Sequence, residues 1–136
     1  MDPTFSKPLA EATPQEIQLE LIRRARWNDL DGERVVAYLL THCDLWQAAL
    51  IDRLSLSRPG RLPASGLIKL RDLPSGYWNA DTLYVLTRDA GCAAELAKIG
   101  EEEWGGMAQV HTDQETIDDA LGIGRSTQAV VSIWWD

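Results

Sequence analysis

The chain has few cysteines and no long hydrophobic run. Cys43 and Cys92 are its two cysteines among 136 residues, and their number and separation argue against the disulfide framework of small secreted domains. No stretch reaches the roughly 18 uninterrupted apolar residues of a membrane helix. The first residues show no basic segment followed by an apolar one, so no secretory signal is expected. These absences predict a cytoplasmic protein that does not enter a membrane, with both cysteines buried as small apolar residues.

Basic residues are scarce in the second part of the chain. Residues 76–136 contain Arg88, Lys98 and Arg125 against eleven acidic residues, whereas residues 1–75 balance ten basic with ten acidic ones. The whole formal net charge of −8 therefore comes from the C-terminal part. An isoelectric point near 4.7 argues against direct nucleic-acid binding, which needs a basic stripe. A field of one sign favours a basic protein partner.

Recognisable metal, cofactor and catalytic motifs are also missing. His42 and Cys43 are adjacent and would point ~100° apart on a helix, which suits a shared metal poorly. Neither they nor Cys92 and His111 show C-x-x-C or H-x-x-x-H spacing. The glycines of residues 121–127 lack the lysine of a phosphate-binding loop. The sequence therefore predicts no metal and no cofactor, and it identifies no catalytic residue.

Apolar periodicity predicts helices in the first part of the chain. Residues 1–12 are expected to form a loose arm. Thr13-Pro14-Gln15-Glu16 is typical of a capping box that opens a helix, which should end near residue 28. A second helix is expected to begin at Asp31-Gly32-Glu33, because apolar residues recur every three or four positions from Val35 to Leu54. A break near His42 is one alternative within that stripe.

The pattern then changes to strands alternating with helices. Residues 67–73 and 82–87 are expected to pair as a hairpin around a loop at 74–81. Asp89 can cap a helix, residues 107–111 form a strand, and Thr112-Asp113-Gln114-Glu115 begins a helix that Gly122 ends. Residues 128–135 are expected to form the last strand. Within it residues 130–135 are apolar on both alternating faces apart from Ser132, which predicts a central strand covered on both sides.

The expected fold is therefore a single α+β domain over residues 13–136, with the order α-α-β-β-α-β-α-β. Its helical part covers residues 13–57. Its sheet part, residues 66–136, holds a mixed sheet of about four strands and two further helices. The N-terminal helices are expected to pack on one face of that sheet.

Aromatic and acidic residues supply the candidate contact surface. Trp46 and one of Trp134 and Trp135 are expected in the core. Tyr77 and Trp78 fall in a predicted loop, and Tyr and Trp are enriched in interface hot spots. The acidic residues form two clusters, which would merge into one negative patch if their helices share a sheet face. The expected partner-binding residues are Tyr77, Trp78, Glu101, Glu102, Glu103, Trp104, Glu115, Asp118 and Asp119.

Three function classes agree with these observations. The first is a small acidic binding protein, in its most specific form an inhibitor or immunity-type protein that masks a basic, nucleic-acid-handling partner. The second is a small-ligand-binding or enzymatic domain with a pocket between the helices and the sheet. The third is a structural subunit of a homo-oligomer, with exposed aromatic residues buried between copies.

Overall fold

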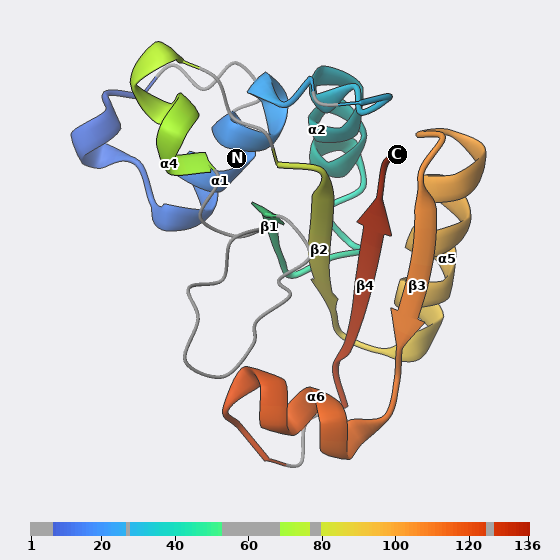
Figure 1. Cartoon of the computed structure of the whole chain (residues 1–136). Coiled ribbons are helices and arrows are strands. Elements are labelled where there is room, and N and C mark those ends of the chain that lie inside the picture. Colours follow the sequence, from blue (N-terminus) through green and yellow to red (C-terminus); the bar gives the residue numbers. More distant parts are fainter. Residues whose placement is uncertain (1–6, 27, 53–68, 77–79, 125–126) are drawn as a thin grey trace, which may run out of the picture.

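The structure, a computed structural model, describes residues 7–26, 28–52, 69–76, 80–124 and 127–136 (Figure 1). Helices and strands follow one another in the predicted order α-α-β-β-α-β-α-β, with one additional short helix after the first strand, so the α+β class is confirmed. The strands are β1 (Ala48–Asp52), β2 (Thr82–Thr87), β3 (Met107–His111) and β4 (Ala129–Trp134). The helices are α1 (Pro14–Arg24), α2 (Gly32–Thr41), α4 (Lys69–Asp72), α5 (Ala90–Glu102) and α6 (Gln114–Leu121), with short 3-10 turns η1 (Leu9–Glu11) and η2 (Leu73–Ser75).

The four strands form one sheet in the order β1-β2-β4-β3. All three pairings are antiparallel, so the expected mixed sheet is wrong in that respect. β4 lies between β2 and β3, which confirms its predicted central position. Thr82 is opposite Trp134, and Met107 is opposite the same residue from the other side.

The first strand is not where the sequence pattern placed it. β1 covers Ala48–Asp52, inside the range assigned to the second helix and to the helical part of the chain. α2 ends at Thr41. The partners of β2 are β1 and β4, not residues 67–73. Of that range, Leu70 and Leu73 are exposed, in α4 and η2, while residues 67 and 68 lie outside the described part.

Short local signals account for the helix ends. The Thr13 hydroxyl accepts a hydrogen bond from the Glu16 backbone, and the Glu16 carboxylate accepts one from the Thr13 backbone, which confirms the capping box. Asp31 and Asp89 cap α2 and α5. α6 is capped by Asp113, one residue later than expected, and ends at Gly122 in the left-handed conformation (φ 72°).

One face of the sheet carries the core. Leu83, Val85, Val131 and Ile133 have no exposed surface and pack with buried residues of α1, α2 and α5. The opposite face, which includes Tyr84, Leu86, Val130 and Trp134, is only half-buried. β4 is therefore covered fully on one side, and the expectation that both of its faces are covered is wrong. Trp46 and Trp135 lie in the core, as predicted.

Helices α1 and α2 approach each other closely at Gly32. A Cβ atom at this position would lie 1.8 Å from the carbonyl oxygen of Ile22, a backbone atom that cannot move aside cheaply. The Gly32 backbone N–H donates a hydrogen bond of 3.1 Å to the Ala25 carbonyl. A glycine is required here by close packing, because only a residue without a side chain lets the start of α2 approach the end of α1 this closely.

None of the helices in the ranges given above combines the length and apolar character needed to cross a lipid bilayer.

Candidate functional site

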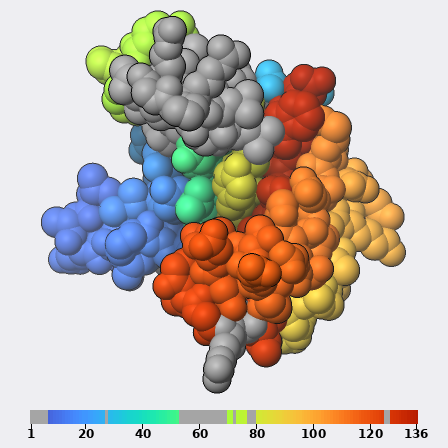
Figure 2. Space-filling model, turned by 60° about the horizontal axis from the view of Figure 1, so that its bottom comes forward, coloured from blue at the N-terminus to red at the C-terminus, as the bar shows by residue number. Residues whose placement is uncertain are grey.

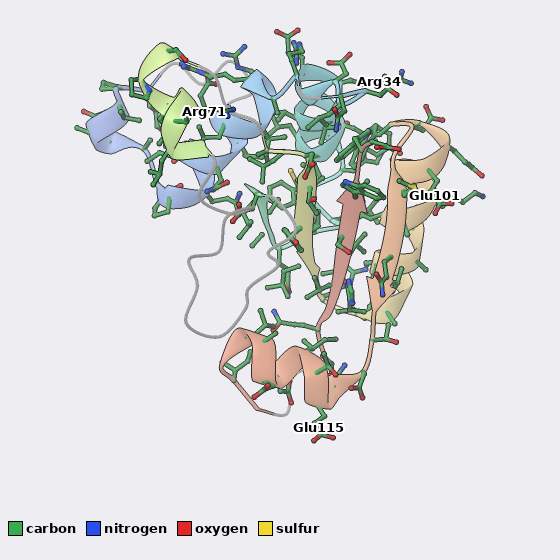
Figure 3. The ribbon with its side chains drawn as sticks, in the orientation of Figure 1. Arg34, Arg71, Glu101 and Glu115 are labelled. Atoms are coloured by element: carbon green, nitrogen blue, oxygen red, sulfur yellow. The ribbon has the colours of Figure 1, made fainter. Side chains whose placement is uncertain are left out.

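The structure separates the two acidic clusters. Glu101, Glu102 and Glu103 end α5 immediately before β3, whereas α6 with its acidic residues begins immediately after β3. The clusters thus lie at opposite ends of that strand, and Figure 3 shows Glu101 and Glu115 far apart. They do not merge into the single negative patch that was expected if their helices shared a sheet face. Glu115 and Asp119 are exposed on α6, and Asp118 is half-buried.

The first cluster borders a hollow between the start of α2 and the end of α5. Its volume is about 330 Å³, and Arg34 is its basic lining residue. The other described residues that line it are Asp29, Asp31, Glu102, Glu103, Trp104 and Gly105. We call this site the acidic hollow. Carboxylates at the C-terminal end of α5 also add to the negative end of the helix dipole, which strengthens the local negative potential.

One ion pair crosses the acidic hollow. The Arg34 guanidinium lies 3.3 Å from a Glu103 carboxylate oxygen, and both side chains are more than half exposed, at 59% and 53%. Exposed pairs of this kind contribute on the order of 1 kcal/mol or less, since water competes for both charges. The pair can therefore exchange with another cation. Glu101 instead accepts a hydrogen bond from the Ala108 backbone at 3.4 Å.

Trp104 lies buried at the base of the acidic hollow and is not an exposed contact residue. It is 5% exposed and belongs to the core cluster. Its ring stands edge to face against Tyr38, with 5.7 Å between centroids, and its carbonyl accepts a 2.7 Å hydrogen bond from the Trp135 indole. The structure thus gives Trp104 a packing role and leaves little of it for a partner to touch. Tyr77 and Trp78 lie outside the described residues.

A second hollow lies on the half-buried face of the sheet. It has a volume of about 350 Å³, and Figure 2 shows β1 and β2 exposed between α1 and α6 at this place. None of the described lining residues carries a charged side chain. They are Pro14, Gln15, Gln18, Ala48, Ala49, Leu50, Tyr84, Val85, Leu86, Leu121 and Val130. We call this site the apolar hollow. It differs from the expected pocket between the N-terminal helical pair and the sheet, because α2 contributes no residue to the described lining and Leu121 of α6 does.

Two glutamines of α1 close one side of the apolar hollow by binding the edge of β1. The Gln15 amide donates to the Ala49 carbonyl at 2.8 Å and accepts from the Ala49 backbone N–H at 2.9 Å. Gln18 accepts from the Ile51 backbone N–H at 3.1 Å. These side chains replace a neighbouring strand, because an edge strand otherwise leaves its N–H and C=O groups unpaired.

Tyr84 forms part of the wall of the apolar hollow. Burial, and secondarily the carboxylates of Asp52 and Asp81, raises the pKa of the Tyr84 hydroxyl above its ordinary value of 10. The hydroxyl therefore remains protonated and neutral at physiological pH. Tyr84 is directly opposite Ser132 in the sheet register, but of the two only Tyr84 is among the described residues that line the hollow.

The histidines and cysteines do not assemble into a metal site. Within the described part of the chain, no group of three His, Cys, Asp or Glu side chains is placed to hold an ion. Cys92 is buried as expected, but Cys43 is exposed because α2 ends before it. His111 Nε2 lies 2.9 Å from Ser132 Oγ. This cross-strand pair could not be seen in the sequence, because it depends on the register of β3 against β4.

Comparison with protein-family models, with curated proteins and with solved structures finds no significant match to this chain. The two hollows are therefore the candidate functional sites of the described part of the chain.

Proposed function

We propose that this protein is a small acidic binding protein that receives a basic protein partner at the acidic hollow. Its most specific form is an inhibitor or immunity-type protein that masks the basic surface of a nucleic-acid-handling protein. The observation that carries the proposal is the lining of the hollow, in which Asp29, Glu102 and Glu103 outnumber Arg34. Asp31 also lines it, but its carboxylate caps α2 and lies 3.7 Å from the Arg26 guanidinium. A lysine or arginine of the partner would meet carboxylates on several sides.

The exposure of the Arg34–Glu103 pair supports the same function. A partner's guanidinium can replace Arg34 at Glu103 without breaking a buried contact, so little stabilisation is lost when the hollow opens. The excess of acidic residues in the C-terminal part would also increase the rate of encounter with a basic surface, an effect that salt weakens.

A charge-reversal experiment with a matched control tests the proposal. The test variant is Glu102→Lys with Glu103→Lys, and the control is Glu115→Lys with Asp119→Lys on α6. Both pairs change the net charge equally, and all four residues are exposed. Each chain is used to capture proteins from lysate, with elution by salt, and the recovered basic protein is then purified for surface plasmon resonance.

We expect the test variant to lose roughly tenfold in association rate and most of its salt dependence, because local charge sets electrostatic steering. The control variant should retain most of the rate. Equal losses in both variants would show that overall charge, rather than the acidic hollow, attracts the partner. Unchanged kinetics in the test variant would contradict the proposal outright.

A further inference from the structure

The apolar hollow has the dimensions and lining of a small-molecule site. Its volume of about 350 Å³ falls in the range of ligand pockets, which are usually apolar with a few polar groups at fixed positions. The floor is formed by β1, β2 and β4, and the walls by the first turns of α1 and the end of α6. The site is therefore bounded by regular structure on more than one side.

The charge around the apolar hollow restricts what it can hold. No described lining residue is charged, although the chain as a whole carries −8. Burial, and then the carboxylates of Asp52 and Asp81, raises the pKa of the Tyr84 hydroxyl, so this lining residue is itself neutral. An anionic ligand would find no basic side chain among these described residues and would lose its hydration in a largely apolar site.

The polar groups of the hollow are few and mostly in use. The Gln15 amide is held through both its oxygen and its nitrogen by the Ala49 backbone, and the Gln18 amide oxygen accepts from the Ile51 backbone N–H, so both side chains have fixed positions in the wall. The neutral Tyr84 hydroxyl belongs to the half-buried margin of the site. A ligand that fits is therefore largely apolar and has at most a small polar group.

We propose that the apolar hollow binds a neutral, largely aromatic or aliphatic small molecule on the sheet face opposite the core. This inference is independent of the acidic hollow, since the two sites share no lining residue. Leu50 is 43% exposed on edge strand β1 and lines the site. Its side chain would gain contacts with the bound ligand.

Two related dyes provide the probes. N-phenyl-1-naphthylamine is neutral, and 1-anilinonaphthalene-8-sulfonate has the same ring system with an added sulfonate. We expect saturable binding of the neutral dye to the full chain, detected by fluorescence, at one molecule per chain. The sulfonate should weaken binding at least about tenfold, because its charge must be desolvated in a largely apolar site.

A matched pair of variants tests whether the dye binds in the apolar hollow. Leu50→Trp fills the hollow, whereas Met107→Trp is the control, since Met107 lies on the other edge strand of the same face at 48% exposure and does not line the site. Leu50→Trp should lower the affinity for the neutral dye at least about tenfold, and the control should change that affinity less than about twofold. Equal effects of both variants would overturn the proposal.

Methyl NMR of the unaltered chain keeps the test valid if Leu50→Trp fails to fold. Addition of the neutral dye should shift the methyl signals of Leu50, Leu86, Leu121 and Val130. Shifts confined to other residues would overturn the proposal. The absence of saturable binding would overturn it too, and this result is expected if another part of the chain fills the hollow.

Discussion

The two faces of the sheet are built from similar residues and have different surroundings. On the core face, Val85, Val131 and Ile133 are completely buried beneath α1, α2 and α5. On the opposite face, Leu86 and Val130 are only half-buried and line the apolar hollow. Strand residues of similar apolar character therefore hold the fold together on one face and form a candidate ligand site on the other. Composition alone does not distinguish these roles.

The largest expected difference between the two sheet faces is the loss of stability when one side chain of β4 is shortened on each face. Ile133→Ala removes three carbon atoms from the core face, where Gly100 and Gly106 leave room for this side chain. We expect it to lower the free energy of unfolding by about 3 kcal/mol. Val130→Ala on the other face should lower it by about 1 kcal/mol or less, because the side chain is half-buried. Urea denaturation measures both values, and equal losses would mean that both faces are covered.

The difference between the faces was only partly predictable from the sequence. The presence of apolar residues on both faces of residues 130–135 correctly predicted that β4 is central, but it also predicted that both faces are covered, and that part is wrong. The covering helices are determined by contacts between distant segments, such as α5 with β3 and β4. The apolar hollow likewise joins Pro14 to Val130, which no local pattern relates.

The location of β1 shows where local signals fail. The three- and four-residue spacing from Val35 to Leu54 fits a helix, yet Ala49 and Ile51 also alternate as a strand requires. Pairing with β2 decides between them, and pairing is a long-range effect. By contrast, the capping box that begins α1 and the β-rich run of β2 were predicted closely, although α1 ends at Arg24 rather than near residue 28. The separation of the acidic clusters could have been inferred, because residues 107–111 were predicted as a strand between them.

Removing the glutamine hydrogen bonds to edge strand β1 should have a medium-sized effect on stability. Gln15→Ala removes both hydrogen bonds to Ala49, which should lower the free energy of unfolding by about 1–2 kcal/mol and leave backbone groups of β1 unpaired. Gln18→Ala removes the single bond to Ile51 and should cost less.

Denaturation ranks these variants, and light scattering detects any new self-association through the freed edge. A Gln15→Ala chain as stable and as monodisperse as the unaltered one would show that α1 does not protect this strand.

The smallest expected effect concerns Tyr84 on the half-buried face. Its pKa is raised in the folded state, so the folded protein binds this proton more tightly than the unfolded chain. Stability from this group is fully present below about pH 10 and is lost as pH rises above that value. Tyr84→Phe should therefore make the loss of stability at alkaline pH less steep. Denaturation at several alkaline pH values measures the slope, and an unaltered slope would mean that Tyr84 ionises as freely as in the unfolded chain.

The central position of β4 has a consequence for the order of events during synthesis. β2 and β3 touch through β4 rather than directly, since the sheet order is β1-β2-β4-β3. Until β4 has paired with both of its neighbours, the β1–β2 pair and the α5–β3 unit can each form, but no strand joins them. The growing chain then holds two partly folded pieces whose facing strand edges are open to other proteins. Translation speed near this segment, and any chaperone that shields those edges, would therefore influence how much of the protein reaches its native state.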